Sequence, residues 1–130
     1  MFVCDTNIVS ELTRPEPNRG VVNWVDSKPF LYVSAVTVEE MTFGLTINPK
    51  VRALEWFKAQ FKEKFKVLPI DEEIAEMAGV LRGKFRKQGR PREQADMLIA
   101  ATAKIYGLTL VTRNVRDFEG CEVAVLNPFS

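Results

Sequence analysis

Short apolar runs alternate with amphipathic segments along the whole chain. Five of the runs are rich in β-branched and aromatic residues and have the length of strands. We expect these strands at Phe2–Cys4, Phe30–Ser34, Lys66–Ile70, Leu108–Thr112 and Glu122–Leu126. Between the first four, apolar residues recur at helical spacing. The pattern predicts helices at Ile8–Leu12, Val21–Val25, 37–47, Val51–Phe65, 72–88 and Ala95–Tyr106, with a loop or short turn at Asn114–Phe118.

Capping and helix-breaking residues support several of these limits. Asp71 is placed to cap the helix after it, and Gly107 stands where glycine commonly ends a helix. Because strands alternate with helices from end to end, we predict an α/β fold. The expected architecture is a three-layer α/β/α sandwich around a central parallel sheet of four to five strands, in a single domain spanning residues 1–130.

Composition removes several classes of protein and of chemistry. The chain has 130 residues, of which 46% are hydrophobic, so one domain can bury a core. No apolar run approaches the roughly 18 residues of a membrane span, and no signal peptide is visible, so we expect a cytoplasmic protein. Two distant cysteines, Cys4 and Cys121, fit no metal-ligand spacing. There is no histidine, which excludes Ser-His-Asp and Cys-His catalysis and every zinc site that uses histidine.

Four acidic residues fall where strands or their following helices open toward one edge of the predicted sheet: Asp5, Glu40, Asp96 and Asp117. Ligands bind in the crevice beyond the strand ends of parallel sheets. Close carboxylates repel one another unless a cation lies among them, and oxygen-only ligands suit Mg²⁺ or Mn²⁺. A metal so held can promote cleavage of a phosphodiester.

Each acid also has a structural explanation. Asp5 or Thr6 could merely cap the next helix, and Thr37 with Glu40 fits a capping box. Asp96 could complement a helix dipole, and Asp117 could close a turn. Glu39 competes with Glu40 for the same role, although the register after Thr37 favours Glu40.

Four segments, in order, carry a family resemblance: Asp5-Thr-Asn7, Thr37-Val-Glu-Glu40, Gln94-Ala-Asp96 and Thr112-Arg-Asn114-Val-Arg-Asp117. The chain resembles the PIN domain, and within it the VapC or FitB-like toxin ribonucleases of bacterial toxin–antitoxin pairs. The resemblance covers the whole chain. It implies an Mg²⁺- or Mn²⁺-dependent endoribonuclease in which Asp5, Glu40, Asp96 and Asp117 bind metal, supported by Thr6 and Asn114. It also implies a homodimer held inactive by a cognate antitoxin of the VapB or FitA kind.

The segment before Asp96 departs from the family pattern. Arg92 stands where many relatives have an aliphatic residue, and Glu93 stands where they have a small polar one. We interpret Glu93 as an ordinary charge of the first helical turn.

Basic residues lead directly to Asp96: Arg82, Lys84, Arg86, Lys87, Arg90 and Arg92. A charge run is usually a solvated face, and its first half also complements a helix C-terminus. Next to a candidate metal site we favour a track for the RNA backbone, made by Arg86, Lys87 and Arg90, with Arg113 and Arg116 beside Asp117.

The aromatic face of Trp56, Phe57, Phe61 and Phe65 is typical of core packing. Trp56 widens it, so a dimer or antitoxin groove is the alternative.

Rival functions lack their own signatures. An Asp-dependent phosphatase needs a second aspartate where Asn7 stands, and a receiver domain needs paired acids at the end of the first strand. A non-catalytic PIN-like module usually lacks one or more of the four acids, and all four are present.

Overall fold

Five parallel strands form one sheet with the first strand at its centre. In the computed structural model, which describes residues 1–130, the strand order is β3-β2-β1-β4-β5. The strands are β1 (Phe2–Cys4), β2 (Leu31–Ser34), β3 (Phe65–Leu68), β4 (Thr109–Val111) and β5 (Val125–Leu126). Every neighbouring pair is parallel, as predicted. Their carboxyl ends therefore meet at one edge.

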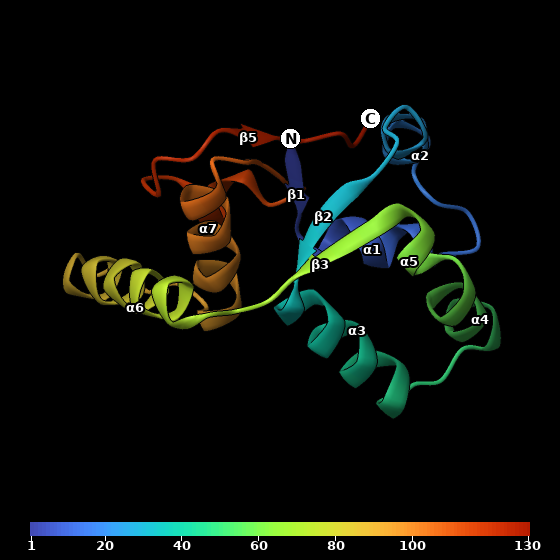
Figure 1. Ribbon diagram of the computed structural model, residues 1–130, viewed down its shortest axis with the longest axis horizontal. Helices are drawn as coiled ribbons and strands as arrows, with labels where there is room; N and C mark the ends of the chain where they lie inside the picture. The colour runs from blue at the N-terminus through green and yellow to red at the C-terminus, as the bar shows by residue number, and fades with distance from the viewer.

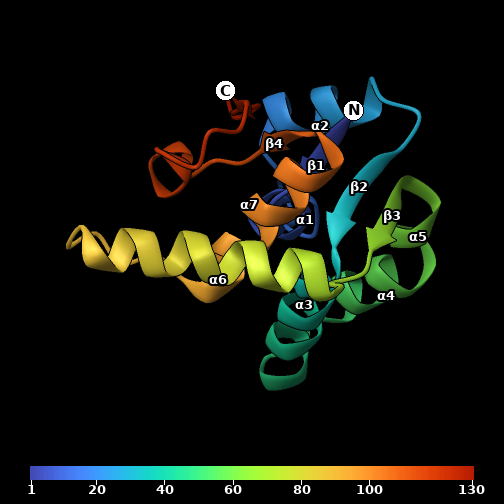
Figure 2. The ribbon, with the colours of Figure 1, turned by 60° about the vertical axis from the view of Figure 1, so that its left-hand side comes forward.

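Eight helices cover or flank this sheet. The α-helices are α1 (Thr6–Leu12), α2 (Arg19–Asp26), α3 (Ala35–Ile47), α4 (Val51–Ala59), α5 (Phe61–Lys64), α6 (Glu72–Lys87) and α7 (Gln94–Tyr106), and η1 (Val115–Phe118) is a 3₁₀ helix. In Figure 1, α6 and α7 lie on one side of the strands, and α1, α4 and α5 lie on the other. Figure 2 shows α3 projecting away from the end of β2.

Two hydrophobic cores lie on the two faces of the sheet, and alternate strand residues divide between them. Val3 packs with the apolar stripes of α6 and α7, whereas its neighbour Cys4 packs with α1, α2 and α5. Leu110 and Val111 divide in the same way. The predicted three-layer α/β/α sandwich is thus confirmed.

Several limits differ from the sequence-based expectation. The helix predicted over Val51–Phe65 is two helices, and Phe65 starts β3 because it pairs with Leu31. The strand predicted at Glu122–Leu126 is confined to Val125–Leu126, and Glu122 adopts a left-handed φ of 58° that interrupts an extended run. The third helix starts at Ala35, where Ser34 caps it, and not at Thr37.

Other expectations are confirmed. Asp71 Oδ1 accepts a hydrogen bond from Ile74 N at 2.9 Å and caps α6, and Gly107 ends α7 with φ of 65°. Both cysteines are buried free thiols. None of the helices combines the length and the apolar character that crossing a membrane requires.

Candidate acidic site

Asp5 lies at the carboxyl end of the central strand and is only 5% exposed. Its Oδ1 accepts a hydrogen bond from Thr6 N at 2.7 Å, so the capping role is present. Its Oδ2 accepts a second bond from Thr112 Oγ1 at 2.8 Å, across the boundary between β1 and β4, and a third from Asn7 Nδ2 at 3.2 Å. Capping therefore occupies one oxygen, and the other is held by a residue 107 positions away.

Glu40 faces this network from α3. Thr6 Oγ1 donates to Glu40 Oε1 at 2.6 Å and lies 2.9 Å from Thr37 Oγ1. Because α3 begins at Ala35 and not at Thr37, Glu40 falls in the second helical turn rather than the first, and the capping-box explanation is wrong. Glu39, the competing acid, is exposed.

Asp96 and Asp117 are the other two of the four predicted acids. Asp96 occupies the first turn of α7, and Asp117 lies in η1. Burial is the main cause that raises the pKa of Asp96 from 3.8 to about 7. Repulsion from nearby acids adds to it, in decreasing order from Asp5, Asp117, Glu40 and Glu93. The four predicted acids are therefore close enough to act on one another electrostatically.

Burial also raises the pKa of Asp5. Hydrogen bonds from Thr112 and from the amide of Thr6 lower it, whereas the charges of Glu40 and Asp117 raise it. Hydrogen bonds that stabilise the ionised form oppose desolvation in this way. Asp5 is thus a carboxylate held in place by three donors.

The donor atoms of the site suit a hard cation, but they do not form a closed metal site. No three acidic side chains lie close enough together, as they stand, to hold one ion. The donors are all oxygens, which Mg²⁺ and Mn²⁺ prefer. Asp5 and Glu40 are held by hydrogen bonds, whereas the side chains of Asp96 and Asp117 accept none. The donor set suits such an ion in its chemistry, and holding one ion would require the two unrestrained carboxylates to turn toward it.

Two further polar residues belong to this network and were not among the predicted site residues. Thr112 Oγ1 donates to Asp5 and accepts from Asn114 N at 3.0 Å, and Asn7 Oδ1 accepts from Arg113 N at 3.3 Å. Predicted Asn114 enters only through its backbone. Thr112 directly follows β4, which pairs with β1 in register, so knowledge of the strand order, which was not predicted, would have placed it beside Asp5.

The comparison with known proteins decides the family. The family model described as "PIN domain" matches residues 2–120. The chain belongs to the PIN-domain family. Toxin FitB of Neisseria gonorrhoeae is 38% identical to this PIN domain, with 99% of both chains covered. VapC ribonuclease Y4jK of Sinorhizobium fredii is 34% identical, covering 99% of this chain and 98% of the relative.

A solved structure agrees with these sequence relatives. The structure of FitAB bound to an IR36 DNA fragment contains a chain that is 37% identical to this PIN domain. Its TM-score is 0.87, and 100% of this chain and 96% of that chain are covered. The family resemblance seen in the sequence is therefore confirmed.

The basic residues of this PIN domain divide by what their charges contact. Arg86 and Lys87 at the end of α6, and Arg116 in η1, are exposed and make no ion pair, since the chain's one ion pair joins Arg14 to Glu11 at 3.5 Å. Arg90 donates to Gln88 Oε1 at 2.9 Å, and Arg113 lies over the ring of Phe129 at 4.9 Å. Arg92 is half-buried and bonds to backbone carbonyls, so it is not a free charge of this surface.

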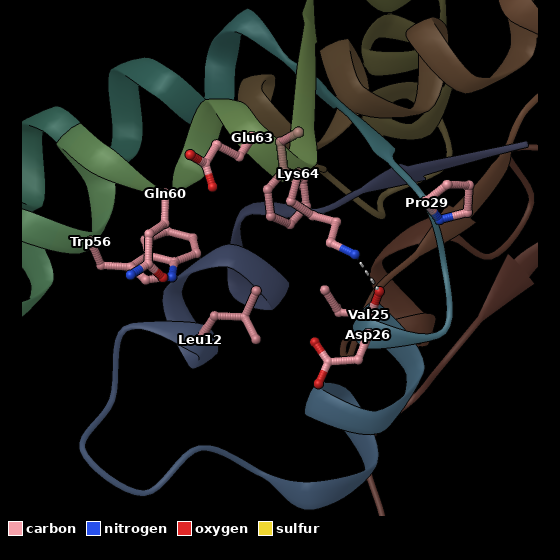
Figure 3. Close-up of a pocket in the computed structure, with 9 residues that line it drawn as sticks. Leu12, Val25, Asp26, Pro29, Trp56, Gln60, Glu63 and Lys64 are labelled. Atoms are coloured by element: carbon pink, nitrogen blue, oxygen red, sulfur yellow. Dashed lines mark hydrogen bonds between the residues drawn. The ribbon is translucent and has the colours of Figure 1, made fainter.

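The aromatic face belongs chiefly to the core. Phe61 and Phe65 are buried and stacked at 5.3 Å between ring centroids. Trp56 is half-buried and lines a cavity of about 430 Å³ between α1, α2, α4 and α5 (Figure 3). Lys64 reaches across it and donates to Val25 O at 3.2 Å. None of the four site acids lines this cavity, so it is separate from the acidic site.

Proposed function

We propose that this PIN domain is a metal-dependent endoribonuclease and the toxin of a toxin–antitoxin pair. The observation that carries the proposal is the gathering of four acids at the carboxyl edge of the sheet, where burial, with the repulsion of the other acids added to it, raises the pKa of Asp96 to about 7. The names of its relatives, Toxin FitB and VapC ribonuclease Y4jK, support the same activity. RNA is the proposed substrate.

Asp5, Glu40, Asp96 and Asp117 would hold Mg²⁺ or Mn²⁺, with Thr6 and Thr112 fixing two of the carboxylates. When bound, such an ion lowers the pKa of water and stabilises negative charge on the phosphate. Thr112 donates to Asp5 and lowers its pKa against the larger effect of burial, and Thr6 fixes the orientation of Glu40. The protein's own contribution is thus a preorganised half of the site.

Exposed positive charge at the end of α6 and beside Asp117 in η1 supports binding of the RNA backbone. Arg86, Lys87 and Arg116 have no intramolecular ion pair, which leaves them available to phosphates. Arg90 and Arg113 contribute more weakly, because one bonds to Gln88 and the other lies over Phe129.

The proposed partners are a cognate antitoxin of the FitA or VapB kind and a second copy of the chain. The FitAB structure supports the first. Exposed apolar side chains on α3 and α4 support burial by a partner, since Phe43, Ile47 and Val51 are 61%, 68% and 71% exposed.

Cleavage of a structured RNA by the purified protein tests the activity. We expect cleavage with Mg²⁺ or Mn²⁺ and its loss in EDTA or in Asp96→Asn. Glu39→Gln is the matched control, because Glu39 is exposed on the same helix as Glu40 and should retain activity. Cleavage that persists in EDTA would contradict the metal mechanism, and RNA binding without any cleavage would favour a non-catalytic module.

A further inference from the structure

Arg92 joins the segment before α7 to the turn that carries Asp117. Its guanidinium donates to Asp117 O and, at 2.9 Å, to Glu119 O. The two carbonyls lie at the end of η1, and a planar guanidinium can reach both at once, whereas an ammonium group cannot match that fork. The side chain is therefore committed to the backbone of this turn.

The ring of Phe85 holds Arg92 in this position. The guanidinium carbon lies 4.2 Å from the ring centroid, and Phe85 is buried in the core on that face of the sheet. The same ring packs against Gly120, where an added Cβ would lie 3.1 Å from Phe85 Cε1. Arg92, Phe85 and the turn thus form one packed unit.

Other contacts anchor the two sides of this turn, but none of them is a side-chain bond to the backbone of Asp117. Residues 113–117 are exposed, η1 has four residues, and the strand that follows it has only two. Phe118 and Cys121 are buried anchors, and Lys104 Nζ donates to Cys121 O at 2.9 Å, four residues beyond Asp117. Arg92 is the side chain that bonds to the backbone of Asp117 itself.

We propose that Arg92 is a positioning residue for Asp117. It fixes the backbone from which this carboxylate reaches the acidic site, and it does not contact RNA. The inference rests on the proposed nuclease function, in which Asp117 takes part in catalysis.

Arg92→Lys separates this role from phosphate binding, because lysine keeps the charge but cannot form the two-carbonyl fork. We expect kcat for RNA cleavage to fall by between about tenfold and 100-fold, as for a displaced catalytic group, with KM little changed. In an Asp117→Asn background, Arg92→Lys should cause no further loss, because it acts through Asp117. Lys104→Met, which frees the same segment beyond Asp117, is the control and should keep kcat near the wild-type value.

A raised KM, or the same loss of activity with and without Asp117, would overturn the proposal. Hydrogen exchange of the RNA-free protein gives a second readout that does not require activity. Arg92→Lys should speed exchange of the Asp117 and Glu119 amides, which bond within the turn at 3.1 and 3.3 Å, and leave the amides of α7 unchanged. Unchanged exchange at these two amides would contradict the positioning role even if the wild type proved to cleave no RNA.

Discussion

Two aspartates of the site differ in the hydrogen bonds that stabilise their ionised forms. Asp5 is nearly fully buried and accepts hydrogen bonds from Thr6, Asn7 and Thr112. Asp96 is less buried and accepts none, so nothing in the chain offsets its desolvation and the repulsion of its neighbours. Asp5 is the fixed carboxylate, and Asp96 is the one that a proton or a cation stabilises most.

The raised pKa of Asp96 predicts a pH-dependent cost to the metal-free fold. Asp96 binds its proton more tightly in the folded chain, where its pKa is about 7, than in the unfolded chain, where it is near 3.8. Protonation of Asp96 therefore stabilises the folded chain relative to the unfolded chain. This stabilisation is fully present below pH 3.8 and is lost as the pH rises through 7. In EDTA, Asp96→Asn should therefore melt above wild type at pH 8, by a margin that shrinks at pH 5 and shrinks further toward pH 3.8. A mutant that melts lower than wild type at both pH values would indicate that Asp96 serves to complement the dipole of α7.

At the scale of elements, prediction from sequence succeeded where a capping residue marks a helix end. The Asp71 cap and Gly107 limited α6 and α7 closely. The α5–β3 boundary was missed because helical apolar spacing continues into Phe65, and only its pairing with Leu31 makes Phe65 a strand residue. Glu40 and Asp96 could be proposed from their motifs, but the contacts of Thr112 and Arg92 depend on neighbours that are distant in sequence.

The basic residues at and just beyond the end of α6 lead to a testable prediction for RNA binding. Replacing Arg86, Lys87 and Arg90 with Ala should weaken binding and flatten its salt dependence, by about 0.7 in the log–log slope for each phosphate of a single strand that is no longer neutralised. Arg52, Lys58 and Lys62, exposed on α4 and α5, give a control triple with the same change in charge. Fluorescence anisotropy across a salt series, with uncleavable RNA, measures both slopes. Equal slopes for the two triples would show that the α6 charges are only a solvated face.

At the scale of the whole molecule, the parallel sheet brings acidic side chains together at its carboxyl edge and is covered by a hydrophobic core on each face. Its two cores support β1 from either side, so Asp5 stands on the most enclosed strand. Elements from both halves of the chain then bring Glu40, Asp96 and Asp117 toward it. The repulsion among these acids is a cost of the metal-free fold that the proposed cation would remove.

Melting curves with and without Mn²⁺ test that claim without any knowledge of the RNA. A cation that binds only the folded chain should stabilise wild type by about 2.7 kcal/mol at a hundredfold excess over its dissociation constant. Asp96→Asn should gain less from the same Mn²⁺, while melting no lower than wild type in EDTA at pH 8. A wild-type protein whose melting temperature does not change even in millimolar Mn²⁺ would contradict the proposal that the four acids form a cation site.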